Sequence, residues 1–441
     1  MSLFRSKYAR PCSGLEALVL SLSLASLAGL AFPLPAHACP TCTSLPHYTA
    51  HEWGTFTTLS DSKGNSLAGL YLDDEKLPAF VYTLPFYHPP ESEPYPNPTA
   101  LAGVTTKMET PVIYFYSDSG FQAQAEVDFR GGAITQWYPK RISGDTNPAP
   151  DGIDFKKDAG NRLGKIRWEF QVLPKGSAAA PSPTGLTGDW NIMRSTESNL
   201  IQASSGEIEK FLFYRGLGHL SLPLKLSMPS RDTLRLANDG GYDLAYVLVL
   251  DLLSGDPNPV WWQGPLAAGS EITLSKPATV VLPLPEAIKG FVDALVHAGL
   301  NQLEAVTMLQ KWNIHYFNHP GFKVFWIVPR ALTDSILPLR LNPAPDELAR
   351  VLVGRSEVLP PDFESVLRQA QTSGTVATYQ GDRRYLAYLD YLDHVESQSA
   401  SFIFRAPYHR RTRGENGLGS AIHPGYRGKF WNGLGRMTSP Q

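Results

Sequence analysis

The chain has 441 residues, of which 43% are hydrophobic, with 39 basic and 41 acidic side chains. This length is enough for two or three domains with sizeable cores. The near balance of charge is not the basic footprint of a nucleic-acid-binding protein, so no nucleic-acid partner is expected.

The first 38 residues predict a cleaved secretory signal: a basic start at 5–10, an apolar run over 17–34, and small residues at Ala36 and Ala38. A retained anchor is one alternative, because the run is near the lower length for a membrane span. A lipoprotein is another, since Cys39 stands where a lipidated cysteine would be. The cleavage pattern and the lack of a basic stop favour removal. We expect an exported protein, periplasmic or extracellular.

Cleavage leaves two cysteines, Cys39 and Cys42, and removes three basic residues and Glu16, so that 36 basic and 40 acidic residues remain. Two close thiols in an oxidising compartment predict a local disulfide or idle thiols that act as a tether. A zinc site would need a second ligand pair and a redox site a helix N-terminus. Neither context is evident, but both alternatives stay open.

Residues 39–282 predict an antiparallel, β-sandwich-like domain. Over 121–129, apolar residues alternate with polar ones at the period of a half-buried strand. Gly131-Gly132 predicts a tight hairpin turn into a return strand over 133–138. Further strands are expected at 110–116, 165–172, 210–214, 245–252 and 279–282. Two Pro-rich stretches, 84–98 and 173–188, interrupt them and predict long surface loops.

Residues 283–400 predict an α+β segment that packs on the sandwich. Pro285 and Gly299 delimit one helix, and Asn301 with Glu304 forms a capping pair for a second, which makes a helical hairpin. The second helix has an apolar stripe at 303, 306, 309, 312 and 316. Strands at 324–328 and 346–359 and helices at 361–371 and 383–395 follow. Residues 401–441 predict a basic, Gly-rich tail that could weakly contact an acidic membrane surface.

The weak catalytic candidates are His51, Glu52 and Glu109. Neighbours in a strand point to opposite faces, so His51 and Glu52 do not form one acid–base pair there. A zinc-protease motif would need histidine at position 55, where this chain has Thr55. Each candidate therefore needs a partner from elsewhere, such as Glu109 or His88 for His51.

The weak ligand-binding candidates are His88, Lys107, Arg355 and Glu357. His88 lies among aromatic residues of the first Pro-rich loop, and Lys107 is a candidate partner for Glu52. Arg355 and Glu357 share a strand face at a spacing of two, and Glu357 or Glu109 is expected to pair with Arg355. His315 and His319 are four residues apart, but Pro320 follows directly, so no metal site is predicted. No nucleophile elbow, dinucleotide fingerprint or EF-hand loop occurs, and no cofactor is expected.

Several segments occur in a characteristic order: HEWGTFT (51–57), KMETPVIYFYS (107–117), GGAITQWYP (131–139), KFLFYRGLG (210–218), GLNQLEAVTML (299–309) and ARVLVGRSEVL (349–359). Together they resemble a family of uncharacterised exported bacterial proteins that open with His-Glu-Trp-Gly-Thr-Phe-Thr. The resemblance covers most of residues 51–360. It implies an envelope or extracellular protein, but it implies no particular activity.

The sequence thus favours an exported, β-rich protein that acts in binding or assembly at the cell envelope, with an envelope ligand or protein of unknown identity as its partner. The alternative is a metal-assisted hydrolase that uses His51, Glu52 and Glu109.

Overall fold

The computed structural model describes residues 45–70, 77–84, 101–146, 153–158, 162–184, 186, 188–253, 258–276, 282–317, 320–373 and 388. Several predictions concern parts of the chain outside these ranges. They are the signal over 1–38, the Cys39–Cys42 pair, the loop with His88, most of the strand at 279–282, most of the helix at 383–395 and the tail over 401–441.

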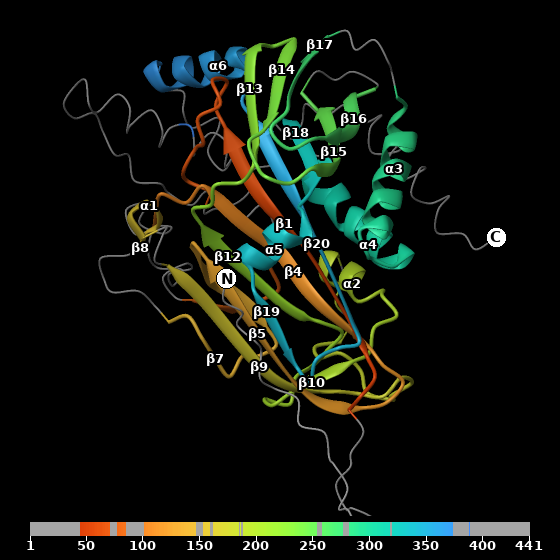
Figure 1. Ribbon diagram of the computed structural model, residues 1–441. Coiled ribbons are helices and arrows are strands. Elements are labelled where there is room, and N and C mark those ends of the chain that lie inside the picture. Colours follow the sequence, from red (N-terminus) through yellow and green to blue (C-terminus); the bar gives the residue numbers. More distant parts are fainter. Residues whose placement is uncertain are drawn as a thin grey trace, which may run out of the picture. The chain divides into compact units, whose positions relative to one another are not determined.

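A nine-stranded sheet forms the centre of the described fold, and most of its strands are antiparallel, as expected (Figure 1). The strands follow one another in the sheet as β16 (Val260–Leu266), β15 (Leu244–Asp251), β18 (Phe322–Ile327), β20 (Glu347–Val358), β1 (Thr49–Ser60), β4 (Thr106–Tyr116), β12 (Leu212–Gly218), β6 (Gly132–Tyr138) and β2 (Tyr82–Thr83).

Three smaller sheets accompany it. The six-stranded sheet consists of β11 (Ile208–Glu209), β10 (Ile201–Ala203), β9 (Leu163–Val172), β5 (Phe121–Arg130), β19 (Leu339–Asn342) and β7 (Ser143–Gly144). The others are β13 (Leu224–Ser230), β14 (Thr233–Asn238) and β17 (Glu271–Ser275), and the pair β3 (Leu101–Ala102) and β8 (Ile153–Asp154).

The helices are α1 (Phe155–Asp158), α2 (Asp189–Met193), α3 (Leu284–His297), α4 (Gln302–Trp312), α5 (Arg330–Ile336) and α6 (Pro361–Thr372). The predicted helical hairpin is α3 and α4, and the capping box of Asn301 and Glu304 is present at the start of α4. Leu303, expected in the buried stripe of α4, is instead 36% exposed, because it lies in the first turn, beyond the edge of the packed face. No described helix combines the length and the apolar character needed to cross a bilayer.

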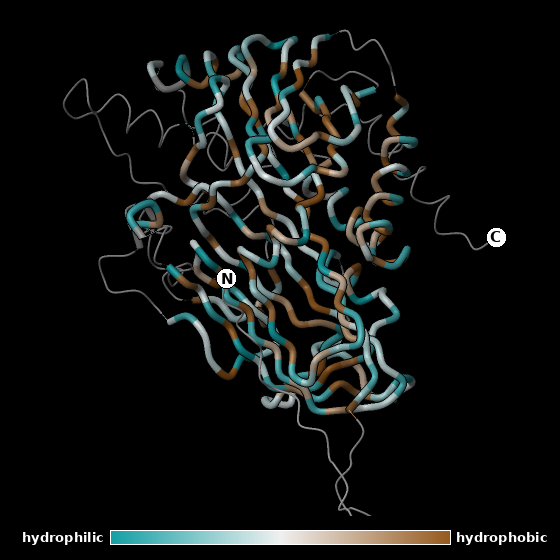
Figure 2. The backbone as a smooth tube through the Cα atoms, in the orientation of Figure 1, coloured by the Kyte–Doolittle hydropathy of each residue, from teal (hydrophilic) through white to brown (hydrophobic). Residues whose placement is uncertain are grey.

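The central sheet is buried on both faces, and each face has its own hydrophobic core. One core joins it to the six-stranded and three-stranded sheets and contains Phe56 of β1, Ala125 of β5 and Trp168 of β9. The other joins it to α2, α3 and α4 and contains Trp53 of β1. Figure 2 shows hydrophobic and hydrophilic residues alternating along α3, as in a helix with one buried face. We call these the sheet-side face and the helix-side face of the central sheet.

The turn at Gly131 does not close a hairpin, contrary to the prediction. Gly131 has the expected positive φ of 79°, but β5 pairs with β9 and β19, whereas β6 pairs with β12 and β2. The turn therefore carries the chain from one layer of the sandwich to the other. Every residue of β6 is buried, which fits a strand of the central sheet, covered on both faces. Strand β5 alternates between buried and more exposed residues over most of its length, which fits the six-stranded sheet.

The predicted segments 39–282 and 283–400 share the central sheet. Strand β20 runs parallel to β1 over twelve residue pairs, from Thr49 opposite Glu347 to Ser60 opposite Val358. Strand β18 pairs with β20 on one side and with β15 on the other. Residue 282 is therefore not a break between layers, because the late strands complete the sheet that the first strand begins.

Candidate functional site

A β-bulge in β4 decides which face of the central sheet carries Glu109 and Lys107. Trp53 of β1 pairs with Val112, but Thr55 pairs with Glu109, so β4 has one extra residue at Thr110–Pro111. In a regular strand, the spacing of three between Glu109 and Val112 would place their side chains on opposite faces. The bulge brings it onto the helix-side face.

The bulge is a close-fitting and strained piece of backbone. Thr110 is the one non-glycine residue with a positive φ in the described chain, at 55°, a conformation that costs a β-branched residue energy. Opposite it, Gly54 leaves room for Pro111, since a Cβ at Gly54 would lie 2.8 Å from the Pro111 Cα. The motifs HEWGTFT and KMETPV therefore fit together at this point.

Buried polar residues line the helix-side face next to the bulge, and we call seven of them the polar strip. They lie on five consecutive strands of the central sheet and are 0–3% exposed. The strip consists of Lys323 on β18, Arg355 and Glu357 on β20, Thr57 on β1, Lys107 and Glu109 on β4, and Arg215 on β12.

Glu109 has partners on several elements of the described chain. Its Oε2 accepts hydrogen bonds from the hydroxyl groups of Thr57 at 2.7 Å and Tyr316 at 2.9 Å. The Nη2 of Arg355 lies 3.4 Å from the same oxygen, and the Nζ of Lys107 lies 3.9 Å from Oε1. The carboxylate thus joins three strands and the helical layer through donors and cations.

Tyr316 covers part of the strip from the helical side. It belongs to a π-helical turn, Asn313–Phe317, that continues α4, and such turns are frequent at functional sites. The guanidinium carbon of Arg355 lies 3.8 Å from the centre of its ring, a cation–π contact. Lys323 donates a hydrogen bond to its carbonyl oxygen. On the strand, Arg355 also meets Glu357, with 3.5 Å between Nε and Oε1.

The polar strip is energetically expensive, because each buried charge loses its hydration, and mutual attraction repays this only in part. Apolar residues of similar size would stabilise this face as well or better. A chain that instead places six charged side chains there, beside a strained bulge and a π-helical turn, has the features of a site kept for function.

His51 lies in a different polar group, at the start of β1. Its Nδ1 is 2.7 Å from Oε2 of Glu304, which is fully buried. Oε1 of Glu304 accepts a hydrogen bond from Tyr116 at 2.7 Å, and the Asn301 backbone amide donates to Oε2. Burial, followed by the nearby Glu304 carboxylate, raises the pKa of Tyr116. This group ties the first turn of α4 to the central sheet.

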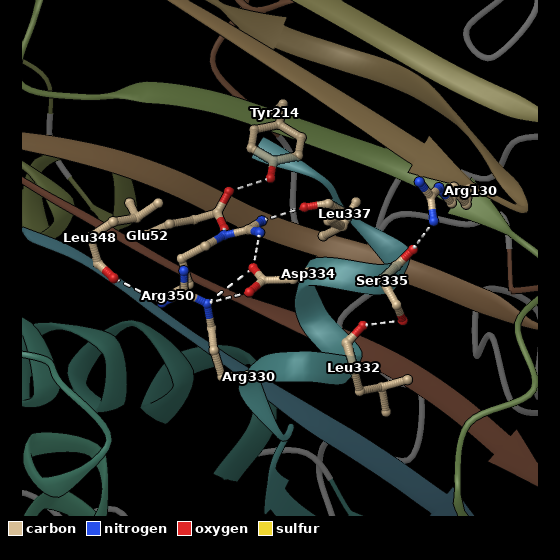
Figure 3. Close-up of polar contacts among 10 residues, drawn as sticks. All are labelled: Glu52, Arg130, Tyr214, Arg330, Leu332, Asp334, Ser335, Leu337, Leu348 and Arg350. Atoms are coloured by element: carbon tan, nitrogen blue, oxygen red, sulfur yellow. Dashed lines mark hydrogen bonds and ion pairs between the residues drawn. The ribbon is translucent and has the colours of Figure 1, made fainter. Parts of the chain in front are cut away.

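Glu52 points to the sheet-side face and enters a third group (Figure 3). It accepts hydrogen bonds from the Tyr214 hydroxyl at 2.5 Å and from Nε of Arg350 at 2.7 Å. Arg350 also donates to Asp334 and to the carbonyl of Leu337. Burial opposes the charge on Arg350, but Glu52, Tyr214 and Asp334 together outweigh it and raise the pKa of Arg350. Burial, followed by the Glu52 carboxylate, also raises the pKa of Tyr214. The group anchors α5 and has the connectivity of a structural ion pair.

The structure brings together four of the residues singled out from the sequence: Lys107, Glu109, Arg355 and Glu357. It does not bring His51 to Glu109, because Thr55, the partner of Glu109, lies four residues along β1, roughly 13 Å away. Glu52 meets Arg350 and not Lys107. His88 is outside the described residues. Within the described part of the chain, no three metal-ligating side chains cluster.

The sequence alone missed Thr57, Tyr316, Arg215 and Lys323. One signal for the bulge was present, because proline within a strand is confined to edges and bulges, and Pro111 stands inside an apolar strand pattern. The other residues carry no local signal. They meet only because β18, β20, β1, β4 and β12 are neighbours in the sheet.

Comparison with known proteins gives little more. No family model matches the chain, and no curated protein matches it. Similar solved structures include the yeast delta-COP-I mu-homology domain complexed with Dsl1 WxWxV peptide, with 7% identity over 71% of this chain and 96% of that chain and a TM-score of 0.24. The Fcho1 Mu homology domain (Danio rerio) with bound Eps15 peptide has 8% identity over 71% and 97% and a TM-score of 0.27. These values are too low to transfer a ligand or partner.

Proposed function

We propose that the mature protein is an exported binding protein of the cell envelope or extracellular space, and that the polar strip is its ligand site. The observation that carries the site is the bulge at Thr110–Pro111, which puts Lys107 and Glu109 on one face with Arg355. Export rests on the N-terminal leader pattern and on the resemblance of the HEWGTFT-type segments to exported bacterial proteins.

The polar strip suits binding because its groups are already held in place. Glu109 is fixed by the hydroxyls of Thr57 and Tyr316, and Arg355 is stacked on the Tyr316 ring. Groups fixed before the ligand arrives lose little freedom on binding, which favours affinity. The strip is 0–3% exposed, so a ligand reaches it only when the chain that covers it moves. Tyr316 and its π-helical turn cover part of the strip.

The hydrolase alternative is less well supported. It requires His51, Glu52 and Glu109 to act on one substrate, but they contact Glu304, Arg350 and Arg355 respectively, in three separate groups and on two faces of the sheet.

A ligand screen tests the proposal. The exported protein is melted in the presence of amino acids, organic acids, sugars, nucleotides and short peptides, since a ligand of the folded state raises Tm. Positive compounds are titrated calorimetrically into wild type, Tyr316→Phe and Tyr114→Phe. The control hydroxyl, that of Tyr114, is buried on the same face but donates to the Met193 carbonyl, outside the strip.

We expect a stoichiometric ligand whose Kd rises about fivefold in Tyr316→Phe, as for one lost hydrogen bond, and stays unchanged in Tyr114→Phe. The proposal is refuted if no compound of the panel binds, or if the two variants bind equally well.

A further inference from the structure

Arg141 lies in the connection that leads from β6 of the central sheet to β7 of the six-stranded sheet. Its neighbours Lys140 and Ile142 are exposed, but its guanidinium stacks on the side chain of Trp137, with the guanidinium carbon 3.6 Å from the ring centre. Gly144 leaves room for this group, because a Cβ there would lie 2.6 Å from Arg141 Nη1. The cation is therefore held in a defined position against an aromatic ring.

Two N–H donors at this corner are buried and have no hydrogen-bond partner within the described chain, Nη1 of Arg141 and Nε1 of Trp137. They belong to side chains that stack on each other, so the two donors lie near each other. Nη2 of Arg141 is used by the protein, since it donates to the Asp145 carbonyl oxygen. Indole and guanidinium groups can only donate, and a buried donor without an acceptor is destabilising. The group that suits this corner is therefore a hydrogen-bond acceptor.

The positive charge of Arg141 is only partly compensated. The Asp145 carboxylate is engaged by backbone amides, with Oδ2 accepting from Ile134 N at 2.6 Å and Oδ1 from Lys165 N at 3.3 Å. Burial lowers the pKa of Arg141, and the Asp145 charge offsets this effect only in part. Arg162 also acts on Asp145, whose pKa burial raises despite both arginines. An acceptor that carries negative charge therefore gains more at this corner than a neutral one.

We infer that the corner formed by Arg141 and Trp137 binds an oxyanion, a carboxylate, phosphate or sulfate group, which accepts hydrogen bonds from Arg141 Nη1 and Trp137 Nε1. The planar guanidinium fork is a common receptor for such groups. Trp137 belongs to the core on the sheet-side face, whereas the polar strip lies on the helix-side face. The site is therefore distinct from the strip, and the inference does not depend on the proposed function.

The ligand reaches the two donors through the connection over 140–143. Both nitrogens are covered by protein atoms, but Lys140, Ile142 and Ser143 are exposed, and Ile142 is 41% exposed although it is apolar. Exposed connections open at a lower cost than core strands. A small shift of this connection uncovers the donors without separating the sheets.

The test titrates acetate, inorganic phosphate and sulfate into the purified protein against sodium chloride at constant ionic strength. Calorimetry measures the affinity. Nitrogen-15 spectra of the indole groups follow Trp137, whose resonance is identified by its loss in Trp137→Phe. The variants for calorimetry are Arg141→Met and, as a matched control, Arg340→Met, because the Arg340 guanidinium is already paired with Glu126 and Asp128.

We expect at least one oxyanion to bind the wild type and to shift the Trp137 indole resonance more than those of the other tryptophans. Its affinity should fall at least about tenfold in Arg141→Met, because a charge-assisted hydrogen bond is lost. It should stay unchanged in Arg340→Met and in Tyr316→Phe, which alters the polar strip. The probe that binds best identifies the anionic group.

Three results overturn the inference. The first is that no probe binds, or that a bound probe leaves the Trp137 resonance unmoved. The second is binding that persists in Arg141→Met, which is an adventitious ion only. The third is binding that is lost in Tyr316→Phe, which assigns the anion to the polar strip. If Arg141→Met fails to fold, the wild-type spectra decide, and if Trp137→Phe fails to fold, the calorimetry of Arg141→Met decides.

Discussion

Gly54 and Pro111 lie in contact across β1 and β4, so close that a Cβ on Gly54 would lie 2.8 Å from the Pro111 Cα. The contact is between backbones, so a rotamer change cannot relieve it. It joins two of the strands that carry the polar strip, at the bulge of β4.

We expect Gly54→Ala to lower the free energy of unfolding by about 1–3 kcal/mol, the usual cost of forcing an atom into a packed site. Gly241→Ala is the matched control, because a Cβ there meets nothing within 4 Å, and it should change stability by less than about 0.5 kcal/mol. Urea unfolding of both variants measures the difference. Equal stability of the two would show that β1 and β4 separate without cost.

The strain at Thr110 can be isolated by comparing two substitutions. Alanine and glycine both remove the outer part of the side chain, but only glycine adopts a φ of 55° without strain. Elsewhere in a strand alanine is the more stable of the two. Here we expect Thr110→Gly to be more stable than Thr110→Ala by about 1 kcal/mol, as measured by chemical denaturation. The reverse order would mean that the bulge relaxes when the threonine is removed.

The Glu52–Arg350 pair is predicted to be structural. Glu52→Ala leaves the Arg350 charge buried without its 2.7 Å partner and should cost about 3–5 kcal/mol of stability. The double variant Glu52→Leu/Arg350→Met removes both charges and should be the more stable of the two. Unfolding curves give the order. If Glu52→Ala unfolds like wild type, the pair does not hold α5 to the sheet.

Stability should fall at alkaline pH. Burial, with the Glu207 carboxylate nearby, raises the pKa of Tyr82 and of Tyr138 to about 12 in the folded protein, compared with about 10 in the unfolded chain. Between these values the unfolded chain releases protons that the folded protein keeps, so the stabilisation is complete below about pH 10 and is lost as pH rises through about 12.

Urea unfolding at pH 8–12, with tyrosinate absorbance at 295 nm, measures this loss. Tyr82→Phe removes one of the titrating groups, so its stability should depend less steeply on pH above 10 than that of wild type. An unchanged slope in that variant would remove Tyr82 from the explanation.

Much of the secondary structure could be predicted from the sequence, because strands and helices have different local periods of apolar residues. The alternation over 121–129 gave β5, and Asn301 with Glu304 gave the start of α4, as the capping box confirms. The turn at Gly131 was also correctly placed. The sequence did not predict that this turn leads into another sheet. The pairing of β6 follows from its burial on both faces, which depends on segments far away in the chain.

The sequence by itself determined the β-rich class, the helical hairpin and the opposite directions of His51 and Glu52, because these follow from the period of the backbone. Only the tertiary structure decided that Glu109 and Lys107 face the helical layer beside Arg355, Lys323 and Arg215. A single extra residue in β4 reverses the side to which the rest of the strand points. The polar strip is then assembled from five strands whose order in the sheet is fixed by long-range packing.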